Sequence, residues 1–541
     1  MATFLLSCQP APVTTPDRVG DSTYKPLLVR STDLGPAPAW EPVTVTLQLV
    51  DPAAAGRQAA AAAIYDPRSP TYLDYLDAGR QAALFGPDPA AAGAVQQRLR
   101  AAGLSAGWNR GSEFVTARGP AAAVAHLLGV PIHDFRSRRG ILFYAGLRSA
   151  AVPAGLAGLV RAVDYVTSYP RNRTAFVPQG GITPPGVNTA YDVGGLRDAG
   201  VDGTGETVVI WALGDGFDQK GLDTFSDQFH LPRVIPTVIF GPADAKPGSE
   251  LMMDIEVVHA IAPGAAIHVI TDDGKDEAAV YDHMLADKAT VWSNSWGACE
   301  QGGAGRVEPA AYTAAAAAGI SALQSTGDSA AYRCLDVDWG APPSDKYVGV
   351  EYPAALPFGI TAVGGTRLSV RADGTYLDEV VWAQPLTTAG SGGGISALDD
   401  QPAWQRGPGV TDNPQNPHNH RMIPDVVADA DPSSGMAIFV DGSWSQGGGT
   451  SQAAPMWAAY ITLINAYLVK KGLKRVGFVN PALYDLAAGK PPFPPFHDIT
   501  VGNNLLYPAG RGFDIATGLG SPDVWNLARD LETYQRKGGK P

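Results

Sequence analysis

Apolar and polar positions follow two patterns along the chain, and the first third is typical of a small α+β unit. Residues 43–50 alternate between apolar and polar side chains, which predicts a strand. Residues 91–102 have helical spacing, with Arg98 and Arg100 on the outer face. Two further strands are expected at 114–116 and 141–144, and an alanine-rich helix at 121–128.

The pattern changes near residue 190. Short apolar runs at 208–213, 266–270, 291–295 and 322–325 end in glycine, aspartate or serine. Helical stretches at 250–261, 277–287 and 309–318 alternate with these runs. Alternation of this kind predicts an α/β domain with a parallel sheet, and active sites in such domains gather at the carboxyl ends of the strands.

The segment between the two patterns is rich in proline, glycine and arginine, and it indicates an exposed linker. We therefore expect four parts. Residues 1–40 form a flexible extension, 41–170 an α+β domain, 171–189 a linker, and 190–541 an α/β domain.

Composition excludes several classes of protein. With 45% hydrophobic residues the chain is not disordered overall, and 3 cysteines cannot staple 541 residues. The net charge of −13 argues against nucleic acid as a partner, because phosphate binding needs a basic surface. The longest apolar stretch, 453–469, contains Pro455 and Asn465 and is shorter than the ~20 residues of a membrane helix, so we expect no membrane partner.

Charge is divided unevenly along the chain. Residues 1–180 carry a net charge of +5, and residues 181–541 carry −18. One interpretation is two domains that attract each other at neutral pH and less so in acid. The other is two solvated surfaces that merely differ in charge.

The most informative motif is the glycine-rich segment 447–449 followed by Thr450, Ser451 and an apolar helix with Pro455. A serine on the first helical turn exposes its hydroxyl, and its backbone N–H faces the same space, so one residue supplies a nucleophile and part of an oxyanion hole. The alternative is a serine that only caps a core helix.

Acidic residues supply two further motifs. Glu250 and Asp254 are four residues apart, so both carboxylates lie on one helical face, where repulsion raises one pKa and favours sharing of a proton. The alternative is a solvated acidic face. Asp328, in Gly327-Asp328-Ser329, follows an expected strand, and it either caps the next element or faces the site.

Taken together, these motifs resemble the sedolisin family of serine-carboxyl peptidases, and its kumamolisin-like members in particular. The Glu-Xaa-Xaa-Xaa-Asp helix, the Gly-Asp-Ser turn and the Gly-Thr-Ser-Xaa-Xaa-Xaa-Pro helix start occur in the family's order. The resemblance implies a subtilisin-like parallel sheet flanked by helices, preceded by a small α+β propeptide domain. It also implies that Glu250, Asp254, Asp328 and Ser451 are catalytic, and that Trp296 and Glu351 bind substrate.

Residues near both ends extend the resemblance. Residues 66–76 and 84–87 match the family's propeptide signature. This match implies an intramolecular inhibitor and an activation cut in the linker 171–189. Near the C-terminus, a glycine-rich loop with two carboxylates suits Ca²⁺, which prefers hard oxygen ligands, although such spacing alone also fits a plain loop. The resemblance implies one structural calcium ion held by these residues: Asp498, Ile499, Gly510, Gly512 and Asp514.

Two positions depart from the kumamolisin-like pattern. Ala330 stands where these enzymes usually have glycine, and Ala212 stands where they carry an acidic residue. Both departures affect the expected substrate preference and leave the catalytic positions intact. Cys299 and Cys334 fit either a disulfide or two buried thiols.

We therefore interpret the chain as the precursor of an acid-acting endopeptidase that uses Ser451 to form an acyl-enzyme. The alternatives are a tripeptidyl-peptidase of the same family and an inactive, calcium-stabilised binding protein. The expected partners are protein or peptide substrates and the chain's own propeptide, and we expect a secreted monomer, although residues 1–8 lack the basic start of a signal peptide.

Overall fold

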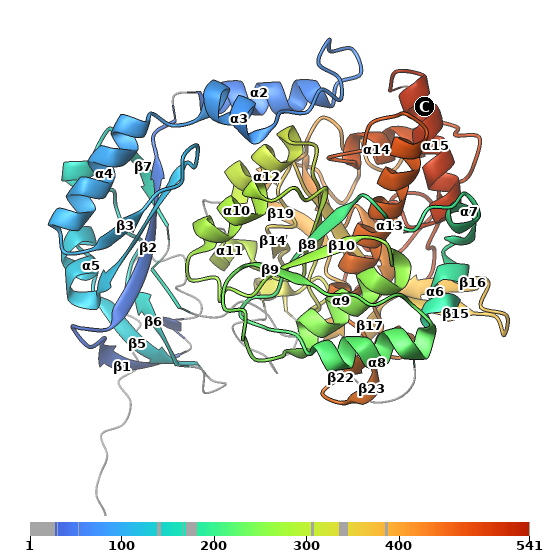
Figure 1. The fold of residues 1–541 in the computed structure, drawn as a ribbon, viewed down its shortest axis with the longest axis horizontal. Coiled ribbons are helices and arrows are strands. Elements are labelled where there is room, and N and C mark those ends of the chain that lie inside the picture. The colour runs from blue at the N-terminus through green and yellow to red at the C-terminus, as the bar shows by residue number, and fades with distance from the viewer. Residues whose placement is uncertain are drawn as a thin grey trace, which may run out of the picture.

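A computed structural model of the 541-residue chain describes residues 28–29, 31–51, 53–137, 142–164, 166–168, 181–303, 308–334, 344–384 and 388–539. Two parts lie side by side, a smaller N-terminal one and a larger C-terminal one (Figure 1). Among the described residues, no helix combines the length and hydropathy needed to span a membrane.

The N-terminal part consists of two antiparallel sheets with helices. Its four-stranded sheet has the order β3-β4-β2-β7, and its three-stranded sheet the order β1-β5-β6. Val43, Val45 and Leu47 point from β2 into a core shared with α4, because alternate residues of a strand face one side. The elements are β1 Thr32–Pro36, β2 Pro42–Leu49, α2 Ala54–Ile64, α3 Ala78–Phe85, α4 Pro89–Ala101, β3 Ser105–Gly107, β4 Phe114–Pro120, α5 Ala121–Leu128, β5 Ile132–Arg136, β6 Leu142–Gly146 and β7 Val160–Val163.

The C-terminal part is built on a largely parallel sheet with the strand order β16-β15-β13-β11-β8-β10-β9, and β21 pairs with β15. Only β16 is antiparallel to its neighbour among these described strands. The fold class predicted from the sequence is therefore confirmed. The elements as far as the chain's middle are α6 Pro184–Ala190, α7 Gly194–Asp198, β8 Thr207–Trp211, α8 Gln219–Phe229, β9 Thr237–Phe240, α9 Ser249–Ile261, β10 Ala266–Ile270, α10 Glu277–Ala286, β11 Val291–Asn294, β12 Ala298–Cys299, α11 Glu300–Gly303, α12 Glu308–Ala317 and β13 Ser321–Ser325.

The remaining elements complete the sheet and add two long helices. They are β14 Glu351–Tyr352, β15 Thr361–Val370, β16 Tyr376–Val381, β17 Ala383–Gln384, β18 Ala389–Gly390, β19 Gly394–Asp400, β20 His420–Ile423, β21 Val426–Asp429, β22 Ala437–Val440, β23 Ser443–Gln446, α13 Thr450–Lys470, α14 Asn480–Ala488, β24 Phe496–His497, β25 Ser521–Pro522 and α15 Val524–Arg536.

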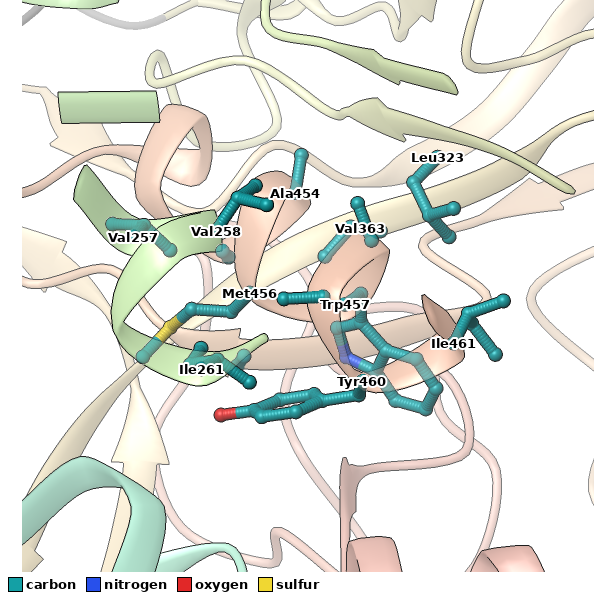
Figure 2. Close-up of a cluster of buried hydrophobic side chains, with 14 of the residues drawn as sticks. Val257, Val258, Ile261, Leu323, Val363, Ala454, Met456, Trp457, Tyr460 and Ile461 are labelled. Atoms are coloured by element: carbon teal, nitrogen blue, oxygen red, sulfur yellow. The ribbon is translucent and has the colours of Figure 1, made fainter. Parts of the chain in front are cut away.

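Helix α13 lies at the centre of the C-terminal core. Its Met456, Trp457 and Tyr460 pack between α9 and the strands β13 and β15, together with Leu323 and Val363 (Figure 2). Because α9 and α13 share this buried core, packing fixes the two helices that carry the predicted carboxylate pair and the predicted nucleophile relative to each other.

The structure differs from the expected organisation at two places. Residues 32–36, expected in a flexible extension, form β1, which pairs with β5 and so is held by an antiparallel ladder. Residues 184–190, mostly expected in the linker, form α6, because Thr183 caps the helix and Pro184 fits its first turn. Val187 of α6 is fully buried in the C-terminal core, and residues 171–180 of the expected linker lie outside the described residues.

The N-terminal part packs on α10 and α12. The Tyr65 hydroxyl donates to the Ala316 carbonyl at 2.5 Å and accepts from the Phe478 N–H at 2.9 Å. Thr116 of β4 donates to Asp276 at the start of α10, over 2.6 Å. Buried apolar side chains around Tyr65 complete the contact, so the N-terminal part covers one flank of the sheet.

Candidate active site

Ser451 is the second residue of α13, which follows the glycine-rich segment 447–449. Gly449, the residue before the helix, has φ of 81°, a left-handed conformation that glycine adopts without strain. Ser451 is 5% exposed. The turn therefore delivers the serine hydroxyl to the beginning of a buried helix, as the sequence predicted for this motif.

Pro455 changes the hydrogen bonding of this first turn. In a regular helix the N–H of residue 455 would donate to the carbonyl of Ser451, and proline has no N–H. The hydroxyl of Ser295, just after β11, lies 3.4 Å from that carbonyl oxygen and can donate to it instead. The proline four residues after the serine therefore leaves room for a contact from the sheet.

Asp254 reaches the same hydroxyl from α9. The Ser295 Oγ lies 3.1 Å from Asp254 Oδ2 and 3.4 Å from Oδ1. Ser295 therefore links the carboxylate of α9 to the backbone of Ser451. Burial first, and then the charge of Glu250, raise the pKa of Asp254 well above its usual range, and the Ser295 hydrogen bond partly opposes them.

Glu250 lies one helical turn before Asp254, and both side chains are buried, at 2% and 0% exposure. The solvated acidic face considered for this spacing is therefore excluded by the structure. Since burial and mutual repulsion both favour the neutral form, the two carboxyls are suited to hold one proton between them.

Asp328 approaches the helix start from the other side. It follows β13, and its Oδ1 accepts the Thr450 N–H at 2.8 Å and the Thr450 hydroxyl at 3.0 Å. Burial raises the pKa of Asp328, while these hydrogen bonds and the charge of Arg333 lower it. The structure thus brings Glu250, Asp254, Asp328 and Ser451 to one end of the sheet.

The two residues expected to bind substrate differ in their surroundings. Trp296 is half-buried just after β11, where its carbonyl accepts a hydrogen bond from Gln324 at 2.9 Å. Glu351 is fully buried in β14, and its carboxylate pairs with Arg333. The Glu351 carboxylate is therefore enclosed by protein in this structure, and its contact with a substrate stays a prediction.

The expected calcium ligands lie on one loop. The Gly512 N–H donates to both oxygens of Asp498 at 3.1 Å, and the Gly510 N–H donates to Asp514 Oδ2 at 2.9 Å. Burial raises the pKa of Asp514, against the hydrogen bonds from its loop. No group of three or more His, Cys, Asp or Glu side chains with metal-site geometry occurs within the described ranges.

Comparison with known proteins gives the family. Residues 30–169 match the model of the pro-kumamolisin activation domain, and residues 238–473 match that of the subtilase family. Kumamolisin from Bacillus sp. (strain MN-32) is 34% identical over 444 residues, 75% of this chain and 76% of that one. The chain belongs to the kumamolisin and sedolisin family of serine-carboxyl peptidases.

Other members of the family extend the comparison. Sedolisin from Pseudomonas sp. (strain 101) is 32% identical over 261 residues, 46% of this chain and 42% of that one. The solved structure of Pseudomonas sedolisin, a serine-carboxyl proteinase complexed with two molecules of pseudo-iodotyrostatin, matches with a TM-score of 0.56 and 26% identity, over 67% of this chain and 100% of that one. With its activation domain present, the chain is the zymogen of a serine-carboxyl peptidase.

The structure accounts for one departure from the kumamolisin-like pattern. Ala330 has φ of 53°, in the left-handed region that glycine occupies with less strain, so this kumamolisin-like chain keeps the backbone shape without the glycine. Ala212, which replaces an acidic residue, is fully buried at the end of β8.

Sequence reasoning missed three polar residues of this serine-carboxyl peptidase site. They are Ser295 and Asp215, which follow β11 and β8, and Arg333. Asp215 accepts the N–H of Glu250, and burial raises its pKa to about 6. The rule that led to Asp328, a polar residue at the carboxyl end of a parallel strand, would have found Ser295 and Asp215. No comparable signal marks Arg333.

Proposed function

We propose that the mature peptidase is an acid-acting endopeptidase that hydrolyses proteins through an acyl-enzyme on Ser451. The observation that carries the proposal is the convergence on one helix start. Asp254 reaches Ser451 through Ser295, and Asp328 holds the neighbouring Thr450.

In this proposal the Ser451 oxygen attacks the peptide carbonyl while its proton passes to Glu250. Asp254 holds Glu250 and shares the proton of the pair. Glu250 then gives the proton to the departing amine as the C–N bond breaks, and water releases the acyl group by the same steps in reverse. Protonated Asp328 donates a hydrogen bond to the oxyanion, which requires a pKa above the working pH.

Acidic working conditions follow from the residue types. An ordinary carboxyl has a pKa of ~4, so a carboxyl pair holding one proton is a competent base in acid, where a histidine would be protonated. The raised pKa values of Asp254 and Asp328 support this assignment, because one proton must stay in the pair and another on Asp328.

The test uses the full-length zymogen and mass spectrometry before and after acidification. Ser451→Ala should remain uncut, and Glu250→Ala should lose at least ~10²-fold in rate. Ser293→Ala is the matched control, because Ser293 is a buried serine of β11 whose hydroxyl has no hydrogen-bond partner among the described residues. If pure Ser451→Ala is processed efficiently, Ser451 is not the nucleophile. If the native chain shows no peptidase activity at about pH 4, the inactive binding protein is favoured.

A tripeptidyl-peptidase is the second candidate. Tripeptidyl-peptidase 1 from Canis lupus familiaris is 25% identical over 528 residues, 87% of this chain and 88% of that one. Peptides with a free and with a blocked N-terminus separate the two functions. Cleavage of the blocked peptide supports an endopeptidase, and cleavage confined to the free peptide, three residues from its end, supports the alternative.

We propose a structural Ca²⁺ ion on the loop of Asp498 and Asp514. The two carboxylates contact the same 510–512 segment, and carboxylates and loop carbonyls are the hard oxygen ligands that Ca²⁺ takes. Ile499, Gly510 and Gly512 would supply the carbonyls. The ion would tie the loop together and take no part in the reaction.

We further propose that the enzyme is a secreted monomer and that Trp296 contacts the substrate. The Cys299–Cys334 disulfide supports an oxidising compartment. The half-buried indole of Trp296, at the same end of the sheet as Ser451, supports the substrate contact. A peptide inhibitor should change the fluorescence of Trp296→Phe less than that of the native chain, which keeps all 11 tryptophans. An inhibitor-induced change of equal size in both chains would contradict the contact.

A further inference from the structure

A buried ion pair lies beneath the Asp328 turn. The exposed fractions of the Arg333 and Glu351 side chains are 2% and 0%. Arg333 Nη2 donates to Glu351 Oε1 at 3.0 Å and to the Gly297 carbonyl at 2.9 Å, and its Nε donates to Glu351 Oε2. The pair therefore joins the segments on which Trp296 and Asp328 lie.

The pair touches the backbone directly before Asp328. A Cβ placed on Gly327 would lie 2.4 Å from Glu351 Oε2 and 2.9 Å from Arg333 Nε. These distances are too short for a real Cβ, so the ion pair occupies the place that a side chain would fill. Gly327 also has φ of 85°, which glycine alone adopts readily. The position of the turn thus depends on Arg333 and Glu351.

Asp328 is the group that this pair can influence by charge. Its carboxyl faces the neutral donors of Thr450, and the cation of Arg333 is close enough to lower its pKa against the effect of burial. Among the described residues, the charged side chains on the elements around Asp328 include Arg333 on its own segment, Glu351 on β14, and Glu250 and Asp254 on α9, which packs against α13. Tyr332, on the same segment as Asp328, is a further titratable group.

We infer that Arg333 and Glu351 are positioning residues that hold the Asp328 turn and together set the highest pH at which Asp328 keeps the proton it donates to the oxyanion. This inference rests on the proposed role of Asp328. The Arg333 cation favours ionised Asp328, and the Glu351 anion balances that cation. Removing one charge should therefore have the opposite effect to removing the other.

The test measures kcat/KM of the mature enzyme against pH, because that profile reports the pKa values of the free enzyme. Arg333→Gln should move the alkaline limb to higher pH, and Glu351→Gln should move it to lower pH, each by about half a unit or more. Arg333→Lys keeps the cation and should leave the limb near its native position. Either single variant tests the inference if the other does not fold.

A second buried ion pair supplies the matched control. Arg421 and Asp425 are both 0% exposed and pair at 2.6 Å, with no contact to the Asp328 turn among their described hydrogen bonds. Arg421→Gln should lower the thermal stability and leave the alkaline limb in place. If the Arg333 and Glu351 variants behave in the same way, or move the limb in one direction, the inference is wrong.

Asp328→Asn separates this inference from the proposed function. The asparagine oxygen can accept both Thr450 hydrogen bonds, and its NH₂ group remains a donor at every pH, so the alkaline limb set by Asp328 should disappear. Any limb that remains in this variant reports the proton held by the Glu250 and Asp254 pair. An unchanged limb in Asp328→Asn would refute the role of Asp328 itself. A limb that disappears there but does not respond to changes at Arg333 and Glu351 would refute only the inference.

Discussion

Ser295 connects two of the predicted catalytic residues, although no sequence motif singled it out. Its hydroxyl lies between the carboxyl group of Asp254 on α9 and the carbonyl of Ser451 on α13. A hydroxyl has a single proton, so it can donate to only one of these acceptors at a time. When Asp254 holds a proton, Asp254 can donate to Ser295, and Ser295 can then donate to Ser451.

Ser295→Ala should lower kcat/KM by about 10–100-fold, because a hydrogen bond to a charged group contributes about 1.5–3 kcal/mol. The pKa of Asp254 should rise further, since Ser295 lowers it in the native protein. The measurement is the rate profile in acid, with Ser293→Ala, two residues earlier in β11, as the control. Equal rates in both variants would show that the Ser295 contact has no catalytic effect.

At the scale of elements, Pro455 interrupts the hydrogen bonding of the first turns of α13, because it has no N–H to donate to the Ser451 carbonyl. Pro455→Ala restores an N–H that competes with Ser295 for the Ser451 carbonyl. Alanine favours a helix interior over proline by up to about 3 kcal/mol, so the variant should unfold at a higher temperature. Its kcat should fall several-fold. Thermal unfolding in a Ser451→Ala background and kcat in the active chain are the two measurements, and a stabilised variant with native kcat would contradict this account.

The loop at Asp498 and Asp514 gives a second prediction at this scale. A chelator should lower the unfolding temperature of the Ser451→Ala chain, because an ion that binds the native state alone stabilises it by mass action. Asp498→Asn should reduce the effect of the chelator. Identical unfolding curves with and without the chelator would show that the loop holds no metal.

The elements also show what sequence reasoning can reach. The strands near 208, 266, 291 and 322 and the helix near 250 follow from apolar runs and helical stretches that are each local in the sequence, and the structure confirms them. The resemblance to the family rests on motifs that are each local in sequence. Contacts such as that of Ser295 with Ser451, 156 residues apart, leave no periodic trace, because they depend on how strands and helices meet. The Arg333 and Glu351 pair escaped prediction for the same reason.

For the whole molecule, the charges of +5 and −18 on the two parts still predict attraction at neutral pH and release in acid. The dissociation constant of separately produced propeptide with Ser451→Ala peptidase should therefore rise from about pH 7 to pH 4 and depend on salt at neutral pH. A constant value across this range would contradict the electrostatic account.

One contact between the two parts should favour propeptide binding in acid rather than at neutral pH. Asn109 donates to Asp282 of α10 at 3.1 Å, and burial, the main cause, raises the pKa of Asp282 to about 6. A carboxyl with a raised pKa stabilises the folded complex fully below its ordinary pKa of ~4, and this contribution is lost as the pH rises through about 6. Asp282→Asn should therefore tighten propeptide binding at pH 7 and leave it unchanged at about pH 4. Weaker binding at pH 7 would show that the charge of Asp282 holds the propeptide.

The packing of Tyr65 and its neighbours against α12 also has a kinetic consequence. A cut in the segment that joins the two parts removes a covalent bond but none of these buried contacts. The product of the cut is a complex of two fragments that are still held together by these buried apolar contacts. Its lifetime is a dissociation time, and because the fragments can rebind, the onset of activity depends on how dilute the solution is. Cutting starts activation, but dilution finishes it.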